Sequence, residues 1–172
     1  RSQVSALDKI GAEFEKGTLF LPQLIMAASV TQAAFEVIRK HMVMSDNAPV
    51  SKGKIVIATV KGDVHDIGKN IVKVLLENYG YDVIDLGKDV EYQAVVDAIR
   101  DNDVKLCGLS ALMTTTLVSM KETIALIREN NLDCKVMVGG AVLTPEYAKE
   151  IDADFYAKDA KESVDIAKRV LG

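Results

Sequence analysis

Residues 54–68 read KIVIATVKGDVHDIG, and this stretch decides the fold. Its first part, Lys54–Val60, is rich in β-branched residues and lies between glycines, which favours a strand. Apolar residues over 71–76 then follow helical spacing. The stretch therefore predicts a strand, a loop that carries Asp63 and His65, and a helix.

The same alternation of strand and helix continues to the end of the chain. Further strands are predicted at Tyr81–Leu86, Val104–Leu109, Lys135–Val138 and Asp154–Tyr156, and helices near Glu91–Asn102, Leu117–Asn130, Pro145–Ile151 and Ala160–Val170. Such alternation favours a parallel sheet with helices on both faces and right-handed crossovers. We expect an α/β fold, flavodoxin-like or Rossmann-like, whose five parallel strands have the order 2-1-3-4-5.

Composition narrows the classes of partner. The chain has 172 residues, 49% of them hydrophobic, and a formal net charge of -4. This charge, without a Lys/Arg cluster, argues against nucleic acid or anionic lipid as the main partner. No apolar run approaches the roughly 18 residues of a membrane span and no signal peptide is recognised, so we predict a cytoplasmic protein. Cys107 and Cys134 fall in or beside apolar strands, which is typical of inert thiols.

The segment SDNAPVSKG, at residues 45–53, interrupts the apolar periodicity with turn formers and a proline. We therefore divide the chain into a helical module over 1–46, a linker over 47–53 and an α/β domain over 54–172. The first module contains two helical patterns, which would make a thin bundle alone. We expect it to pack on the α/β domain and to be the remainder of a larger helical domain.

Three loops are expected to meet at one rim of the sheet. Ligands of open α/β sheets bind beyond the carboxyl ends of the strands, where the strand order reverses. The loop with Asp63 and His65, the segment Ser110-Ala111-Leu112 and the pair Gly139-Gly140 each follow such a strand end. We predict that these segments, distant in sequence, form one site.

Each loop taken alone leaves several functions open. Asp63-x-His65 is compatible with a metal site, with acid/base chemistry or with an ordinary polar loop, although a closed zinc site would need further ligands. Ser110 also suits a helix cap or a strand end, and Gly139-Gly140 also suits a tight turn. The absence of a G-x-G-x-x-G pattern argues against NAD.

The combination is more specific than its parts. In the chain, Asp63-x-His65-x-x-Gly68 is followed after 41 residues by Ser110-x-Leu112, and after 26 further residues by Gly139-Gly140. This pattern resembles the signature of cobalamin-binding domains. The resemblance covers residues 54–172. In addition, EFEKGTLFLPQLIMAA at Glu13–Ala28 resembles the helical cap of methionine synthase and of corrinoid proteins from methyltransferase systems.

The resemblance implies a cobalamin whose lower base is displaced and whose cobalt is bound from below by His65. Asp63 would accept a hydrogen bond from the other ring nitrogen of His65, fixing the tautomer and strengthening the donor. Thr116 would end this relay, at the position where methionine synthase has serine. Asp63, His65 and Thr116 are thus the implied catalytic residues, and His65 is the implied metal ligand.

The resemblance also implies the residues that hold the cofactor. Gly68, Gly139 and Gly140 would leave a channel for the nucleotide tail. Ser110 and Thr114 would hydrogen-bond its polar atoms. The full implied set is Gly62, Asp63, Val64, His65, Asp66, Ile67, Gly68, Ser110, Leu112, Thr114, Val138, Gly139, Gly140, Tyr156 and Ala160.

The implied function is a corrinoid methyl carrier, not catalytic alone. It would pass a methyl group, as methyl-Co(III) and Co(I), from a substrate-specific methyltransferase to a second methyltransferase that serves a folate or a thiol cofactor. A reductive activase would rescue Co(II), and a homodimer is a further possible assembly. The cap, through Phe20, Leu21 or Leu24, would shield the methyl group and move aside about the linker. Alternatives are the cobalamin subunit of an adenosylcobalamin mutase, a cobalamin-dependent sensor, and a flavodoxin-like or receiver-like domain without corrinoid.

Overall fold

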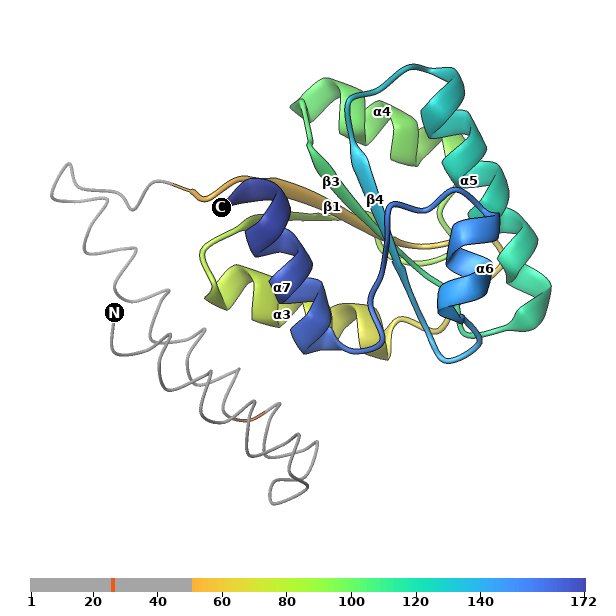
Figure 1. Cartoon of the computed structure of the whole chain (residues 1–172), viewed down its shortest axis with the longest axis horizontal. Coiled ribbons are helices and arrows are strands. Elements are labelled where there is room, and N and C mark those ends of the chain that lie inside the picture. Colours follow the sequence, from red (N-terminus) through yellow and green to blue (C-terminus); the bar gives the residue numbers. More distant parts are fainter. Residues whose placement is uncertain (1–25, 27–50) are drawn as a thin grey trace, which may run out of the picture.

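The computed structural model describes residue 26 and residues 51–172. Residues 51–172 contain a five-stranded sheet of order β2-β1-β3-β4-β5, in which every pairing is parallel (Figure 1). The predicted strand order is therefore confirmed. The helical cap over 1–46, with Phe20, Leu21 and Leu24, and linker residues 47–50 lie outside the described residues.

Strands and helices alternate as the sequence predicts. The elements are β1 Lys54–Thr59, α3 Ile67–Asn78, β2 Asp82–Asp85, α4 Tyr92–Asn102, β3 Leu106–Ser110, the 3-10 helix η1 Thr114–Thr116, α5 Leu117–Glu129, β4 Lys135–Gly139, α6 Pro145–Glu150, β5 Phe155–Tyr156 and α7 Ala160–Leu171. Two details were not expected. Helix α3 begins at Ile67, and η1 precedes α5. Within residues 51–172, none of the helices is both long and apolar enough to cross a bilayer.

The central strands are buried on both faces. Side chains of a strand alternate between the two faces of a sheet. In β1, Ile55 and Ile57 pack in one core cluster with residues of α3 and α7. Val56 and Ala58 pack in a second cluster with residues of α4 and α5. Accordingly, α3 and α7 lie on one side of the sheet and α4 and α5 on the other (Figure 1).

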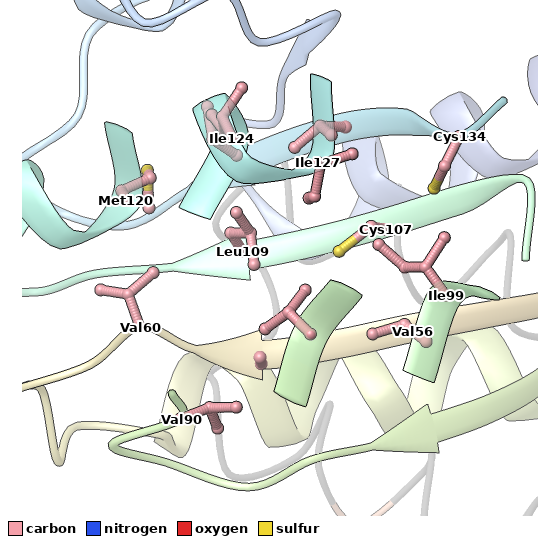
Figure 2. Packing of buried hydrophobic residues seen from close by; sticks show 14 of the residues in the cluster. Val56, Val60, Val90, Ile99, Cys107, Leu109, Met120, Ile124, Ile127 and Cys134 are labelled. Atoms are coloured by element: carbon pink, nitrogen blue, oxygen red, sulfur yellow. The ribbon is translucent and has the colours of Figure 1, made fainter. Parts of the chain in front are cut away.

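Both cysteines belong to the second of these clusters. Figure 2 shows Cys107 and Cys134 among Val56, Ile99 and Ile127. Both thiols are free and buried. Burial raises the pKa of Cys107 well above its usual range, and it raises the pKa of Cys134 to about 12. The thiols therefore stay protonated, which confirms the interpretation as small hydrophobic residues.

The strand register brings the carboxyl ends of three strands to one level. Thr59, at the end of β1, pairs with Ser110 of β3, and Ser110 pairs with Gly139 of β4. The Oγ1 of Thr59 and the Oγ of Ser110 are also 2.9 Å apart and share a hydrogen bond. The loops that follow β1, β3 and β4 therefore start from the same rim, as the sequence predicts.

Candidate functional site

A tight turn carries the chain from β1 into the site. The amide of Asp63 donates to the carbonyl of Val60 at 3.0 Å, which closes a turn with Lys61 and Gly62 at its centre. Gly62 has a φ of 83°, as the third position of a type II turn requires. The turn leaves the side chain of Asp63 completely buried.

The buried carboxylate of Asp63 gathers donors from two loops. Its Oδ1 accepts from the backbone amide of His65 at 3.0 Å and lies 2.8 Å from the ring Nδ1 of His65. Its Oδ2 accepts from the amides of Leu112 at 2.7 Å and Met113 at 3.2 Å, and from the Oγ1 of Thr116 at 3.0 Å. The structure thus brings together Asp63, His65 and Thr116, the three residues of the implied relay.

These contacts keep Asp63 ionised. Burial alone would raise its pKa, because it penalises the charged form. The hydrogen bonds from His65, Leu112 and Thr116 outweigh burial and hold the pKa of Asp63 well below its usual range.

An ionised carboxylate fixes the tautomer of His65. A carboxylate can only accept, so the ring Nδ1 of His65 carries the hydrogen that it shares with Asp63. The lone pair of the neutral ring is then on Nε2, and the side chain is 46% exposed. His65 therefore presents one oriented nitrogen donor, as metal-binding histidines held by a carboxylate do.

A cavity of about 910 Å³ opens beside this donor. Its wall includes eleven of the residues implied by the resemblance: Val64, His65, Asp66, Ile67, Gly68, Ser110, Leu112, Gly139, Gly140, Tyr156 and Ala160. The remaining ones do not line it. Asp63 is buried and hydrogen-bonded to both His65 and Thr116, and Gly62 is part of the turn that precedes it. Thr114 is exposed in η1, and Val138 belongs to the second core cluster.

The cavity also extends along the face of the sheet that α3 and α7 cover, to residues that we did not expect in the site. Ile57, Gly108, Met137 and Ser163 line this part. A Cβ atom at Gly108 would lie 3.0 Å from the Cε of Met137, so the space there is already tight. An isolated glycine inside a buried strand signals a close approach, and Gly108 is the one signal that could have revealed this extension.

Two glycines of the rim lie in close contact with backbone carbonyls of neighbouring loops. A Cβ atom at Gly140 would lie 1.9 Å from the carbonyl oxygen of Ala111, and its φ is 139°. A Cβ atom at Gly139 would lie 3.0 Å from the carbonyl oxygen of Ala157. Packing between the loops after β3, β4 and β5 thus explains these glycines without a ligand.

Gly68 is different, because the fold does not require it. It lies in the first turn of α3 and lines the cavity, and a Cβ atom there would have no neighbour within 4 Å among the described residues. Glycine is a poor helix former, so this position lacks a side chain at some cost to the helix. Open space that a Cβ would fill indicates room for a ligand that approaches the backbone closely.

The residues present fit a bulky cofactor that brings its own metal. Within the described part of the chain, no group of three or more His, Cys, Asp or Glu side chains is placed to hold a metal ion. The site offers instead one oriented imidazole nitrogen beside a large cavity. Such a donor set suits a metal that is held by the ring of a cofactor and takes one further nitrogen ligand.

Family models match both parts of the chain. Residues 53–165 match a model described as a B12 binding domain. Residues 4–39 match a second model with the same description. The first of these spans most of the chain, including all three loops of the rim.

Curated and solved relatives agree with these matches. Dimethylamine corrinoid protein 1 of Methanosarcina acetivorans is 42% identical over 169 residues, which cover 97% of this chain and 79% of that protein. A cobalamin-binding protein of Desulfitobacterium hafniense has a TM-score of 0.82 and 34% identity, covering 96% of this chain and 78% of that one. The methanol:cobalamin methyltransferase complex of Methanosarcina barkeri contains a chain with a TM-score of 0.85 and 31% identity, over 96% of this chain and 63% of that one.

More distant likenesses show only the fold. The receiver domain of a response regulator from Mycobacterium tuberculosis has a TM-score of 0.53 and 18% identity, over 70% of this chain and 96% of that domain. Its likeness reflects the shared α/β architecture.

Proposed function

Since this chain belongs to the B12-binding domain family and its cofactor is cobalamin, we propose that it is a corrinoid methyl carrier that serves methyltransferases. The observation that carries the proposal is the oriented Nε2 of His65, held by the buried Asp63 beside a cavity of about 910 Å³. This arrangement supplies one nitrogen ligand and room for a large ring with its tail.

The role as a carrier is supported by what the relatives are. One is a dimethylamine corrinoid protein, and another is part of a methanol:cobalamin methyltransferase complex. We therefore propose a substrate-specific methyltransferase and a second, acceptor methyltransferase as partners. A folate or thiol cofactor on the acceptor enzyme, a reductive activase, a homodimer and a cytoplasmic location belong to the same proposal.

Each residue of the relay has its own task. Cobalamin, when bound, supplies a cobalt centre that accepts and donates methyl groups. His65 would be its lower ligand through Nε2. Asp63 keeps the hydrogen on Nδ1 and the ring in place, and Thr116 donates to the other oxygen of Asp63.

The carrier role is tested by loading the chain with cobalamin and mixing it, under reducing conditions, with methyltransferases specific for methanol and for each methylamine, each with its own substrate. We expect at least one enzyme to methylate the bound cofactor, seen by its visible spectrum and by isotope-labelled methyl groups that stay with the chain. A loaded chain that none of these enzymes methylates, together with selective retention of adenosylcobalamin, would instead indicate a mutase subunit.

Substitution of Gly68 with alanine tests the cavity without disturbing the fold. A Cβ atom at this position meets no atom of residues 51–172, and alanine favours a helix over glycine by up to about 1 kcal/mol. We therefore expect an unchanged or slightly raised unfolding midpoint and weaker binding of cobalamin, measured by titration. Gly68→Leu should weaken binding further at an equal midpoint. Wild-type affinity in both variants would show that the cofactor does not approach this turn.

A further inference from the structure

The loop between β2 and α4 runs alongside the turn that carries Asp63. The amide of Thr59 donates to the carbonyl of Gly87 at 2.9 Å, and the amide of Val90 donates to the carbonyl of Thr59 at 3.2 Å. Val60 and Val90 then form a parallel bridge. This pairing extends β1 beyond its last residue and brings Asp89 next to the turn.

Asp89 makes two hydrogen bonds to the turn, one on each side of the peptide bond between Gly62 and Asp63. Its Oδ1 accepts from the amide of Gly62 at 2.7 Å. Its own amide donates to the carbonyl of Asp63 at 2.9 Å. The two hydrogen bonds clamp the segment that begins at Gly62 and ends at Asp63, directly before Val64 and His65.

The backbone of Asp89 is in an unusual conformation. Its φ is 54°, in the left-handed region, which aspartate tolerates better than most residues but which still costs free energy. Such a conformation persists only where surrounding contacts hold it, and it is concentrated at functional sites. Here it is the conformation in which the amide and the carboxylate of one residue both reach the turn.

The hydrogen bonds of Asp89 hold the backbone of the turn, whereas the donors from the loop after β3 hold the carboxylate of Asp63. Leu112 and Thr116 set the position of the carboxylate of Asp63, and their hydrogen bonds go to this side chain rather than to the backbone of the turn. A neighbouring ion pair between Lys61 and Glu91 is 2.8 Å long, but its side chains are 44% and 64% exposed. Exposed ion pairs of this kind contribute little to stability. Among the described residues, Asp89 therefore makes the main side-chain contact between the two loops.

We propose that Asp89 is a positioning residue for the cobalt ligand: by clamping Gly62 and Asp63 it fixes the backbone that presents His65. This role rests on the proposed function, in which His65 binds cobalt. The residue acts through Asp63 and His65, is not among the residues that line the cavity, and lies in a loop that the sequence motif does not include.

Three variants separate the hydrogen bond from the backbone strain. Asp89→Gly removes the acceptor but tolerates a φ of 54°. Asp89→Asn keeps both a side-chain carbonyl acceptor and tolerance of the left-handed region. Glu91→Gln, in the same loop, removes only the charge of the exposed pair with Lys61 and is the matched control.

The first readout is the rate of amide hydrogen exchange at Gly62, measured by NMR on the chain without cofactor. Loss of one net hydrogen bond of ordinary strength should speed this exchange about tenfold in Asp89→Gly. Asp89→Asn and Glu91→Gln should exchange within about threefold of the wild type. Unchanged exchange in Asp89→Gly, or equal acceleration in Asp89→Asn, would overturn the clamp.

The second readout is the visible spectrum of the chain loaded with methylcobalamin. Asp89→Gly should show a smaller fraction of the histidine-ligated form, and Asp89→Asn should restore it. If exchange is faster in Asp89→Gly but the spectrum is that of the wild type, Asp89 does not position the ligand and the proposal fails. His65→Ala is measured in parallel to test the ligation itself. If its spectrum stays histidine-ligated, His65 is not the ligand and the proposed function fails. If its spectrum loses the histidine-ligated form, only the role of Asp89 is in question.

Discussion

Replacing Asp63 with alanine should destabilise the cofactor-free chain by about 3 kcal/mol or more, because each buried donor that loses its acceptor costs about 1–3 kcal/mol. The carboxylate accepts from the amides of His65, Leu112 and Met113 and from the hydroxyl of Thr116, and it is completely buried. Its loss leaves the buried amides of the two loops without this acceptor, whereas the hydroxyl of Thr116 keeps the carbonyl of Met113 at 2.9 Å. The free energy of unfolding, measured in urea, checks this expectation.

Asp66→Ala is the matched control for this substitution. Asp66 precedes α3 in the same loop, but its side chain makes no capping hydrogen bond. Its replacement should cost less than about 1 kcal/mol, the range of a charge near a helix N-terminus. Equal losses in the two variants would contradict the central position that we assign to Asp63.

The second large effect is expected for Gly140→Ala. The new Cβ atom would lie 1.9 Å from the carbonyl oxygen of Ala111, in a backbone conformation with a φ of 139°. Backbone strain and overpacking each cost about 1–3 kcal/mol, and here both apply. We expect a loss of several kcal/mol in the free energy of unfolding, or a chain that does not fold, judged by circular dichroism and thermal denaturation.

Gly139→Ala provides a graded comparison at the neighbouring position. Its Cβ atom would lie 3.0 Å from the carbonyl oxygen of Ala157, and its backbone is not in the left-handed region. A small shift of the loop can relieve such a contact, so the loss should be clearly smaller than for Gly140→Ala. A Gly140→Ala chain as stable as the wild type would show that the loop after β3 moves freely.

The fold was predictable because its signals are local and repeated. The β-branched run at Lys54–Val60 recurs in weaker form at each later strand, and helical spacing separates the runs. Parallel strands with right-handed crossovers then leave few topologies. The start of α3 was placed too late, because Gly68 in its first turn interrupts the helical pattern.

The candidate site was only partly predictable. Asp63, His65 and Thr116 were brought together by resemblance, and in the structure hydrogen bonds link these three side chains. The amides of Leu112 and Met113 were missed, because backbone donors leave no trace in a sequence. Asp89 was missed for a related reason: it acts through a strand pairing between residues far apart in the chain.

The glycines show where a motif gives the right residue without the reason for it. Gly140 and Gly68 belong to the same sequence pattern, and the resemblance assigns both to the cofactor channel. The structure separates them, because Gly140 is required by the carbonyl of Ala111, whereas within the part of the chain that the structure describes Gly68 faces open space. Whether such a glycine is required by the fold depends on the distance between loops that are remote in sequence, and only the folded chain provides this distance.

The central claim is that His65 supplies the lower ligand of cobalt, and electron paramagnetic resonance tests it most directly. The chain is produced with nitrogen-15 histidine, loaded with cobalamin at natural abundance and reduced to the Co(II) state, whose unpaired electron couples to the axial nitrogen. Ligation by a histidine predicts that each cobalt line splits into a doublet, and His65→Ala, prepared in the same way, should lose this splitting. A triplet, the pattern of a nitrogen-14 ligand from the cofactor's own base, or a doublet that persists in His65→Ala, would contradict the account.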